Sequence, residues 1–175
     1  MDNELIQAVK DEFFKRREAE SGAIKNTLTV GFPVYDEKEV LAALDCLLSL
    51  RLSQGPIVKE FEKEASDYMN VKYAVAVNSG TSANMLALAS LLNLGKIQPG
   101  DEVIVPAATF SSVVSPIYQL GLVPVYVDVT DTDWFMSVDE VAGAISNKTK
   151  VIMPVYNLGF PGEIEKLVDL AKEKN

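Results

Sequence analysis

The stretch Asn78–Asn84 (NSGTSAN) has the residue types of a turn that binds an anion. An apolar run precedes it and a run rich in alanine and leucine follows it, so we expect a strand, a tight polar turn and a helix. Gly80 allows the backbone to approach a ligand closely, and Thr81 and Ser82 add hydroxyls beside the free N–H groups of the first helical turn. These N–H groups and the positive end of the helix dipole favour a phosphate group at this turn.

The same turn also fits a simpler role, because serine and threonine are common helix N-caps and many such turns bind nothing. Two nucleotide-binding motifs are excluded. No lysine follows the glycine at the place that a P-loop requires, and one glycine is too few for the dinucleotide-binding fingerprint. The residues by themselves leave two interpretations open, a capped helix and a site for the phosphate of a cofactor.

Two further segments follow apolar runs that we interpret as strands, Ala107–Ser111 (AATFS) and Tyr156–Pro161 (YNLGFP). Phe110 comes directly after its strand, so its ring could form a wall on which a flat aromatic cofactor stacks, or it could be a core residue under a loop. Asn157 has the donor and acceptor groups of a site residue, and it could equally cap its own loop.

The composition narrows the possible functions. The formal net charge of -9 repels phosphate backbones and argues against nucleic-acid binding. The sequence has no histidine and a single cysteine, Cys46, which excludes an internal disulfide and is interpreted as a small core residue of a reducing, cytoplasmic protein. Asp128 and Asp131 lack a histidine partner, so we assign them to turn chemistry and expect no metal site. No apolar run is long enough to span a membrane.

The apolar spacing gives the expected elements. A helix over 2–20 and an extended connector over 21–33 make up an N-terminal segment, 1–34. The other predicted helices cover 35–50, 57–69, 81–94, 112–120, 138–146 and 163–174, and the predicted strands cover 73–77, 102–106, 124–128 and 151–155. Asp36 and Ser137 are the expected caps of the helices at 35–50 and 138–146, and Pro99–Asp101 is the expected turn before the strand at 102–106. Strands that alternate with helices predict a three-layer α/β fold with a mostly parallel sheet. Such sheets bind ligands at the carboxyl ends of their strands, where the three polar segments lie.

Several runs resemble one known family, and they occur in the same order. They are LSQGP, YAVAVNSGTSAN, PGDEVIVPAATF, GLVPVYVDV and TKVIMPVYNLG. The sequence from about Thr29 to Asn175 resembles the DegT/DnrJ/EryC1/StrS family. These are sugar aminotransferases that use pyridoxal phosphate (PLP) and have the fold type I architecture. The resemblance implies that residues 35–175 form part of a PLP-binding large domain.

The resemblance also implies roles for single residues. Gly80, Thr81 and Ser82 would hold the cofactor phosphate, and Phe110 would stack on the pyridine ring. Gln54 and Gly55 would line the sugar-nucleotide side of the pocket. No role is carried over to Tyr156 or Asn157, because they stand where the family has a different, histidine-containing motif. The implied reaction moves an amino group from glutamate to a keto nucleotide-sugar, in a homodimer.

Two family residues have no counterpart in these 175 residues. They are the aspartate that pairs with the pyridine nitrogen and the Schiff-base lysine, so we expect an N-terminal part of the enzyme that is inactive alone. One alternative is a hexulose 3-dehydrase, which uses pyridoxamine phosphate (PMP) with an iron–sulfur cluster and has histidine in place of that lysine. Thr109 agrees instead with the aminotransferases. The other alternative is a non-catalytic remnant that acts only in binding or dimerisation.

Overall fold

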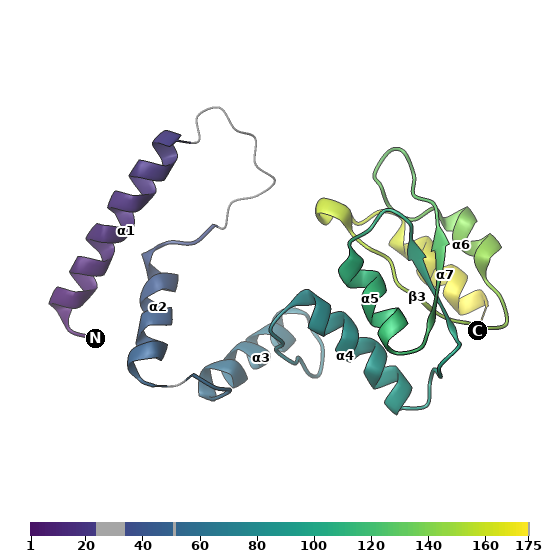
Figure 1. The fold of residues 1–175 in the computed structure, drawn as a ribbon, viewed down its shortest axis with the longest axis horizontal. Helices are drawn as coiled ribbons and strands as arrows, with labels where there is room; N and C mark the ends of the chain where they lie inside the picture. Colours follow the sequence, from purple (N-terminus) through teal and green to yellow (C-terminus); the bar gives the residue numbers. More distant parts are fainter. Residues whose placement is uncertain (24–33, 51, 175) are drawn as a thin grey trace. The chain divides into compact units, whose positions relative to one another are not determined.

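The structure, a computed structural model, describes residues 1–23, 34–50 and 52–174. The chain divides into two compact units, Met1–Ala76 and Val77–Asn175. Figure 1 shows helices in the first unit and a sheet with helices in the second. The predicted boundary after residue 34 falls beside residues outside the described part, so the division of the chain at that point stays a prediction.

The first unit contains the helices α1 (Asn3–Ala23), α2 (Glu37–Leu48) and α3 (Pro56–Tyr68). α2 begins as predicted: the Asp36 carboxylate accepts the N–H of Lys38 at 2.8 Å, and the Glu39 carboxylate accepts the N–H of Asp36 at 2.7 Å. α1 extends past its predicted end at residue 20, and the remainder of the predicted connector, 24–33, lies outside the described residues. In the described ranges, no helix is both long and apolar enough to cross a membrane.

The helices of the first unit bury little apolar surface among themselves. α2 has no buried residue, and Leu47 and Leu48 of its apolar stripe are 57% and 56% exposed. Cys46 is a free, half-buried thiol on the same helix, so its interpretation as a core residue is wrong. The rings of Phe13 and Tyr35 lie 5.7 Å apart and join α1 to the residue before the α2 cap.

The predicted strand at Tyr73–Val77 is wrong, because this segment belongs to no strand in the structure. Tyr73 and Val75 are 75% and 66% exposed, and the N–H of Ala76 donates to the Glu62 carboxylate on α3 at 2.9 Å. A strand is stabilised by a neighbour that shares its N–H and C=O groups. Apolar composition predicts the tendency to be extended and buried, but it does not supply that neighbour.

The second unit is built on a three-stranded sheet in the order β2-β1-β3, with both pairs parallel. The strands are β1 (Glu102–Pro106), β2 (Val123–Val127) and β3 (Thr149–Ile152). β1 agrees with its prediction residue for residue, and β2 starts one residue early. β3 ends before the predicted Val155, although the N–H of Met153 still donates to Ile104 at 2.9 Å. The ladder stops there because its next bond would run from position 106 of β1 to the Met153 carbonyl, and Pro106 has no N–H to donate.

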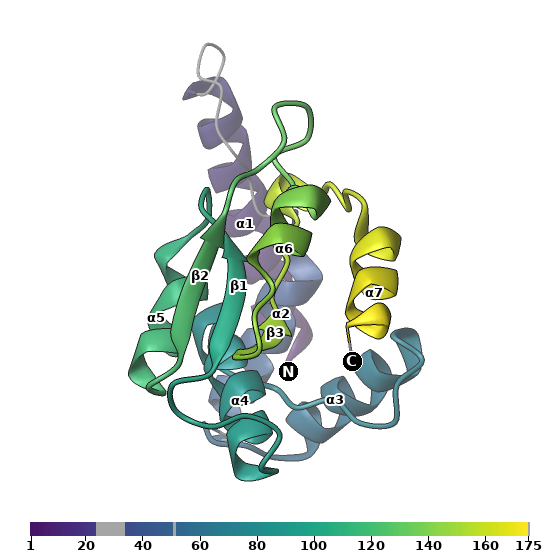
Figure 2. The same ribbon diagram turned by 90° about the vertical axis from the view of Figure 1, so that its right-hand side faces the viewer.

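Helices cover both faces of this sheet, which confirms the predicted three-layer α/β fold. They are α4 (Gly80–Asn93), α5 (Ser111–Gln119), α6 (Val138–Ala144) and α7 (Ile164–Glu173). Val103 and Val105 of β1 pack with α4 and α5, and the intervening Ile104 packs with α6 and α7. This alternation follows from the two-residue period of a strand. Figure 2 shows α5 on one side of the sheet and α6 and α7 on the other.

A loop of buried and polar residues joins β2 to α6. Val129 and Met136 form an antiparallel bridge across it, and Phe135 and Met136 are 2% and 1% exposed. Ser137 caps α6 as predicted, through the N–H of Glu140 at 3.4 Å. Gly162, with a φ of 51°, lies directly against the Phe135 ring, and a Cβ at that glycine would be 2.1 Å from the ring's Cγ. The packing around Phe135 therefore requires glycine at position 162.

Candidate functional site

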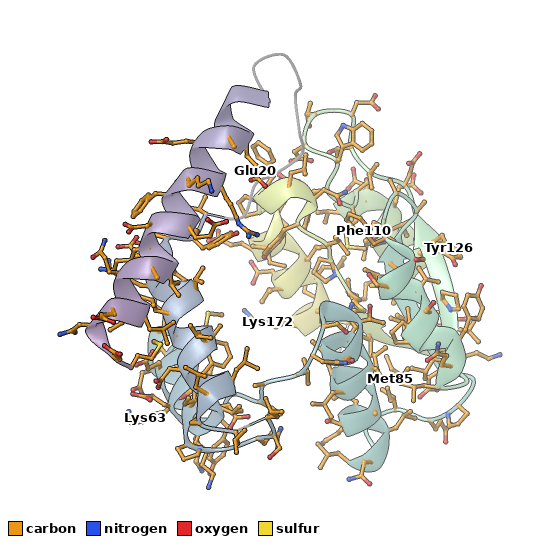
Figure 3. All side chains as sticks on the ribbon, turned by 60° about the vertical axis from the view of Figure 1, so that its left-hand side comes forward. Glu20, Lys63, Met85, Phe110, Tyr126 and Lys172 are labelled. Atoms are coloured by element: carbon orange, nitrogen blue, oxygen red, sulfur yellow. The ribbon has the colours of Figure 1, made fainter. Side chains whose placement is uncertain are left out.

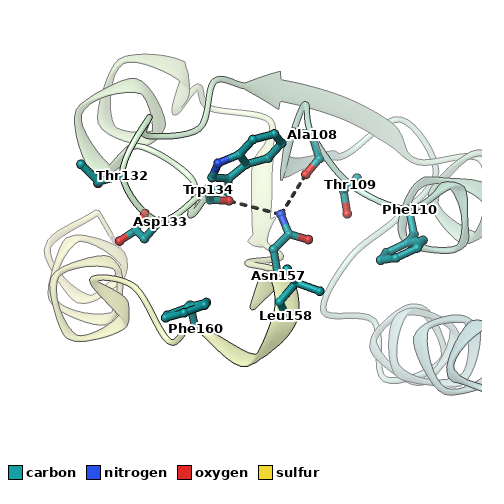
Figure 4. Close-up of a pocket in the computed structure, with 9 residues that line it drawn as sticks. All are labelled: Ala108, Thr109, Phe110, Thr132, Asp133, Trp134, Asn157, Leu158 and Phe160. Carbon is teal, nitrogen blue, oxygen red and sulfur yellow. Dashed lines mark hydrogen bonds between the residues drawn. The ribbon is translucent and has the colours of Figure 1, made fainter. Parts of the chain in front are cut away.

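A pocket of about 590 Å³ lies at the carboxyl ends of the strands of the second unit (Figure 4). Its walls come from the segments that follow β1, β2 and β3. The lining residues are Ala108, Thr109, Phe110, Thr132, Asp133, Trp134, Asn157, Leu158 and Phe160. Of the three segments predicted for this edge, Ala107–Ser111 and Tyr156–Pro161 contribute to the pocket. The loop after β2 contributes as well, although only turn chemistry is predicted for its aspartates, Asp128 and Asp131.

Phe110 lies at one end of this pocket (Figure 4). It is the N-cap residue of α5, and its side chain is 72% exposed, so it is not a core residue under a loop. Figure 3 shows it together with Tyr126, another exposed aromatic of the second unit, which lies on the outer strand β2. An exposed ring at the end of a parallel strand can stack on a flat aromatic ligand.

Sequence reasoning missed Trp134 and Phe160, which give the pocket most of its remaining aromatic surface and are 61% and 60% exposed. Trp134 is the single tryptophan of the sequence. The sequence did contain a signal for Trp134, a large aromatic residue in a polar loop after a strand. A turn that is only solvated gains nothing from such a side chain. Phe160 offered a weaker signal, since its neighbours Gly159 and Pro161 indicate only a turn.

Thr109 offers an unused polar group at the same site. Its Oγ1 is buried and has no hydrogen-bond partner within the described chain. A buried hydroxyl left in this state costs about 1–3 kcal/mol, so a polar partner at the pocket would be stabilised there.

The loop after β2 is held by aspartate side chains. The Asp133 carboxylate accepts the Thr130 hydroxyl and also the N–H of Phe135, the latter at 3.0 Å. The hydrogen bond from Thr130 is the main reason that the pKa of Asp133 lies below its usual range. Asp128 accepts the N–H of Val129 at 2.8 Å, which confirms the turn chemistry predicted for it. Within residues 1–23, 34–50 and 52–174, no group of three or more histidine, cysteine, aspartate or glutamate residues could hold a metal ion.

The predicted phosphate turn is the N-terminus of α4, and Ser79 is its N-cap. The Ser79 hydroxyl accepts the N–H of Ser82 at 3.2 Å, and the Ser79 carbonyl accepts the N–H of Ala83 at 3.0 Å. The Ser82 hydroxyl donates to Asn78 at 2.6 Å and so belongs to the cap. The capping interpretation is thus correct for Ser79. The N–H and the hydroxyl of Ser82 both donate to other residues of the turn.

The cap leaves two donors of the first helical turn open. The N–H groups of Gly80 and Thr81 have no partner among the described residues, and both residues are exposed. A Cβ at Gly80 would meet no atom within 4 Å, so the turn is open on that side of the glycine. Capping and anion binding are therefore compatible at this turn.

Asn84 links this turn to the start of the neighbouring helix. Its Nδ2 donates to the Ser112 carbonyl at 3.2 Å, which joins the second turn of α4 to the first turn of α5. Ser112 lies two residues after Phe110, so the open donors of α4 and the exposed ring belong to adjoining helix N-termini. Residues of the turn itself are not among those that line the pocket.

Gln54 and Gly55 lie in the first unit. Gly55 is the N-cap of α3 and is followed by proline at the first helical position. A hollow of about 320 Å³ is lined by Gln54, Gly55, Pro56, Val58, Lys59 and Glu62. The lining offers an amide, an ammonium and a carboxylate to a polar ligand. The assignment of Gln54 and Gly55 to a sugar nucleotide stays a prediction.

The model of the DegT/DnrJ/EryC1/StrS aminotransferase family matches residues 33–175. The chain is 40% identical over 148 residues to GDP-perosamine synthase of Escherichia coli O157:H7, covering 82% of this chain and 40% of that protein. It is 38% identical over 144 residues to dTDP-4-dehydro-2,6-dideoxy-D-glucose 3-dehydratase of Saccharopolyspora spinosa, covering 80% of this chain and 31% of that protein. The chain thus spans two fifths or less of the length of these two relatives.

The fold is similar to a solved structure of the putative sugar aminotransferase Spr1654 from Streptococcus pneumoniae in its PLP form. The TM-score is 0.76 at 35% sequence identity, and the match covers 84% of this chain and 36% of that one. The likeness extends through most of this chain and about a third of the solved one.

Proposed function

This chain belongs to the DegT/DnrJ/EryC1/StrS aminotransferase family, and on that basis we propose that it forms the cofactor-binding part of a PLP-dependent aminotransferase. The substrate is a keto nucleotide-sugar of polysaccharide or deoxyamino-sugar synthesis, and glutamate donates the amino group. The observation that carries the proposal is the pocket at the strand ends, which has the exposed Phe110 ring on its wall.

The residues at the strand ends fit the cofactor. The open N–H groups of Gly80 and Thr81 at the positive end of α4, with the Thr81 hydroxyl, would hold the phosphate. The Ser82 hydroxyl would hold the turn in shape through its bond to Asn78. Phe110 would stack on the pyridine ring, and the unpartnered Thr109 Oγ1 offers a hydrogen bond to a polar group in the pocket.

Once bound, PLP supplies an electron sink that eases removal of a proton from the carbon bearing the amino group. The chain's own contribution is binding and orientation. Phe110 would hold the plane of the ring, and the neighbouring apolar side chains of Trp134, Leu158 and Phe160 would exclude water from the pocket. Gln54 and Gly55 would contact the sugar nucleotide. The single free thiol of Cys46 and the nucleotide-sugar substrate fit a cytoplasmic location.

A 3-dehydratase that uses PMP is the second candidate. It is favoured by the 38% identity to the 3-dehydratase of Saccharopolyspora spinosa. Both candidates require the turn at the start of α4 for the phosphate and the Phe110 ring for stacking. Binding of the cofactor therefore tests both candidates at once. A remnant that acts only in binding or dimerisation would bind neither form of the cofactor at this site.

Titration of the purified chain with PMP tests the proposal directly. PMP carries an amine in place of the aldehyde, so it forms no adduct with surface lysines. Trp134 lines the pocket and is the single tryptophan, so its fluorescence reports binding there. We expect saturable quenching with one PMP per chain. Absence of quenching, with absence of binding in equilibrium dialysis, would show that the pocket is not a cofactor site.

Thr81→Ala is expected to weaken PMP binding about tenfold or more. The substitution would remove a hydroxyl that donates to a dianionic phosphate, and such a bond contributes roughly 1.5–3 kcal/mol. Folding should be little affected, because the N-cap of α4 is Ser79 and stays intact. The measurement is the dissociation constant from Trp134 quenching.

Ser90→Ala is the matched control on the same helix. The Ser90 hydroxyl is exposed and bonds to the Leu86 carbonyl at 2.7 Å, away from the N-terminal turn. Its loss should leave PMP affinity unchanged. Equal affinities for Thr81→Ala and the wild type would mean that the Thr81 hydroxyl does not hold the phosphate.

Self-association of the chain is a further expectation, and a homodimer is part of the proposal. Among the residues that the structure describes, β2 and β3 each pair on one side only, and an unpaired strand edge invites another chain. Leu47, Leu48 and Phe61 are each more than half exposed. Sedimentation at micromolar concentration should give dimers or larger species, and Leu48→Glu should reduce them. A single monomeric species with a sharp cooperative melt would contradict this expectation.

A further inference from the structure

Asn157 connects the three loops that form the pocket. It follows β3 and opens the short 3-10 helix η1 (Asn157–Gly159). Its Nδ2 donates to the carbonyl of Ala108, in the loop after β1, at 3.4 Å, and to the carbonyl of Trp134, in the loop after β2, at 3.3 Å. Figure 4 shows both hydrogen bonds meeting at this one nitrogen. From this geometry we infer that Asn157 is a positioning residue that sets the shape of the cofactor pocket.

The chemistry of the amide explains why asparagine suits this place. A primary amide nitrogen has two hydrogens, so one atom can serve two carbonyl groups from different loops. A threonine hydroxyl has one hydrogen and could serve only one of the carbonyls, and a leucine could serve neither. The carbonyl groups are main-chain atoms, so the bonds fix the path of the backbone.

Two of the segments that Asn157 holds are in an unusual conformation. Trp134 has a φ of 58° and Leu158, the residue after Asn157, has a φ of 54°. Large side chains rarely adopt this left-handed region, and they remain there only where their surroundings enforce it. The bond to the Trp134 carbonyl contributes to that constraint together with the bond from the Trp134 N–H to the Thr130 carbonyl, and Leu158 directly follows the anchored Asn157. Both side chains line the pocket, so the constraint aims them at it.

The third segment, the loop after β1, carries the exposed ring of Phe110. Ala108 lies one residue before Thr109 and two before Phe110, so a fixed Ala108 carbonyl limits where the Phe110 ring can lie. This step rests on the proposed function, because the ring is useful there only if a flat cofactor stacks on it. Asn157 acts on the cofactor through these neighbours and is not itself a catalytic residue.

The test compares Asn157→Asp and Asn157→Ala in the full chain, with Asn147→Ala as control. Aspartate has nearly the same shape as asparagine, but its carboxylate has no hydrogen to donate and would face two carbonyl oxygens. Asn147 is exposed, precedes β3 at the opposite end of the strand, and its side chain makes no hydrogen bond within the described residues. The readouts are PMP affinity from Trp134 quenching, the Trp134 emission maximum, and hydrogen exchange of residues 108–110.

We expect both substitutions at position 157 to weaken PMP binding by about tenfold, with aspartate at least as harmful as alanine, since two donated hydrogen bonds are lost. The Trp134 emission maximum should shift and exchange at 108–110 should accelerate, while Asn147→Ala matches the wild type. Wild-type affinity and emission in Asn157→Asp would overturn the inference, because a residue that only fills space tolerates this change.

A failure of the proposed function gives a different pattern. If the wild-type chain binds no PMP, the emission maximum and the exchange rates still decide the role of Asn157. Faster exchange at 108–110 in Asn157→Asp then supports its positioning role in a pocket for another ligand. Unchanged exchange and emission overturn it.

Discussion

Gly162→Ala is expected to lower the free energy of unfolding of the second unit by about 3 kcal/mol, the sum of two effects. The φ of 51° at Gly162 is unfavourable for any residue with a Cβ, and the new Cβ would lie 2.1 Å from Cγ and 2.4 Å from Cδ1 of Phe135. That ring is 2% exposed and stacks on Tyr156 with centroids 5.9 Å apart, so it cannot move aside without disturbing its neighbours. Urea unfolding followed by Trp134 fluorescence measures the loss in this unit alone.

Gly143→Ala is the matched control for this substitution. Gly143 lies inside α6, has no left-handed φ, and a Cβ there would meet no atom within 4 Å. Alanine at this position should stabilise the unit slightly, by about 0.5–1 kcal/mol. If Gly162→Ala unfolds at the same urea concentration as the wild type, Phe135 has room to move and the packing argument is wrong.

The second large effect concerns catalysis. The 175-residue chain by itself is expected to transfer no amino group from glutamate to a keto sugar, because no lysine is among the residues that line the pocket. An aminotransferase needs an amine within reach of the cofactor to bind it covalently and to move protons. The measurements are 2-oxoglutarate release and peptide mapping after borohydride treatment with PLP.

Scattered, substoichiometric labelling of surface lysines is the expected mapping result. Addition of PMP before PLP should not protect any of them, since none lies in the pocket. One lysine labelled stoichiometrically, together with release of 2-oxoglutarate, would show that the chain contains a complete active site.

The sequence predicted those elements whose ends are marked by local chemistry. β1 was predicted to the residue because Pro99 and Gly100 mark the turn before it, and α2 and α6 start at capping residues, Asp36 and Ser137. The prediction failed for Tyr73–Val77, where the outcome depends on a partner strand and not on the segment's own residues. The end of β3 shifted because Pro106, on the neighbouring strand β1, has no N–H for the Met153 carbonyl, a signal that was visible in the sequence but was given too little weight.

The candidate site was predicted in outline only. The rule that parallel sheets bind ligands at their carboxyl ends gave its place, and it correctly identified Phe110 and the Tyr156–Pro161 segment as neighbours. The positions of Trp134 and Leu158 depend on left-handed backbone angles that no local motif predicts for such side chains. The bridge made by Asn157 joins residues 49 and 23 positions apart, a separation that one sequence does not reveal.

The strand order also affects how the chain folds as it leaves the ribosome. β1 occupies the middle of the sheet but is made first, and its partners at Val123–Val127 and Thr149–Ile152 follow in turn. At about 5–20 residues per second, β3 follows β2 after roughly one to four seconds. Until α6 and α7 are made, the nascent α4–β1–α5–β2 segment can close one side of the sheet while Ile104 stays uncovered on the other. A chaperone that binds apolar nascent chains would meet its target in this window, before α6 and α7 arrive.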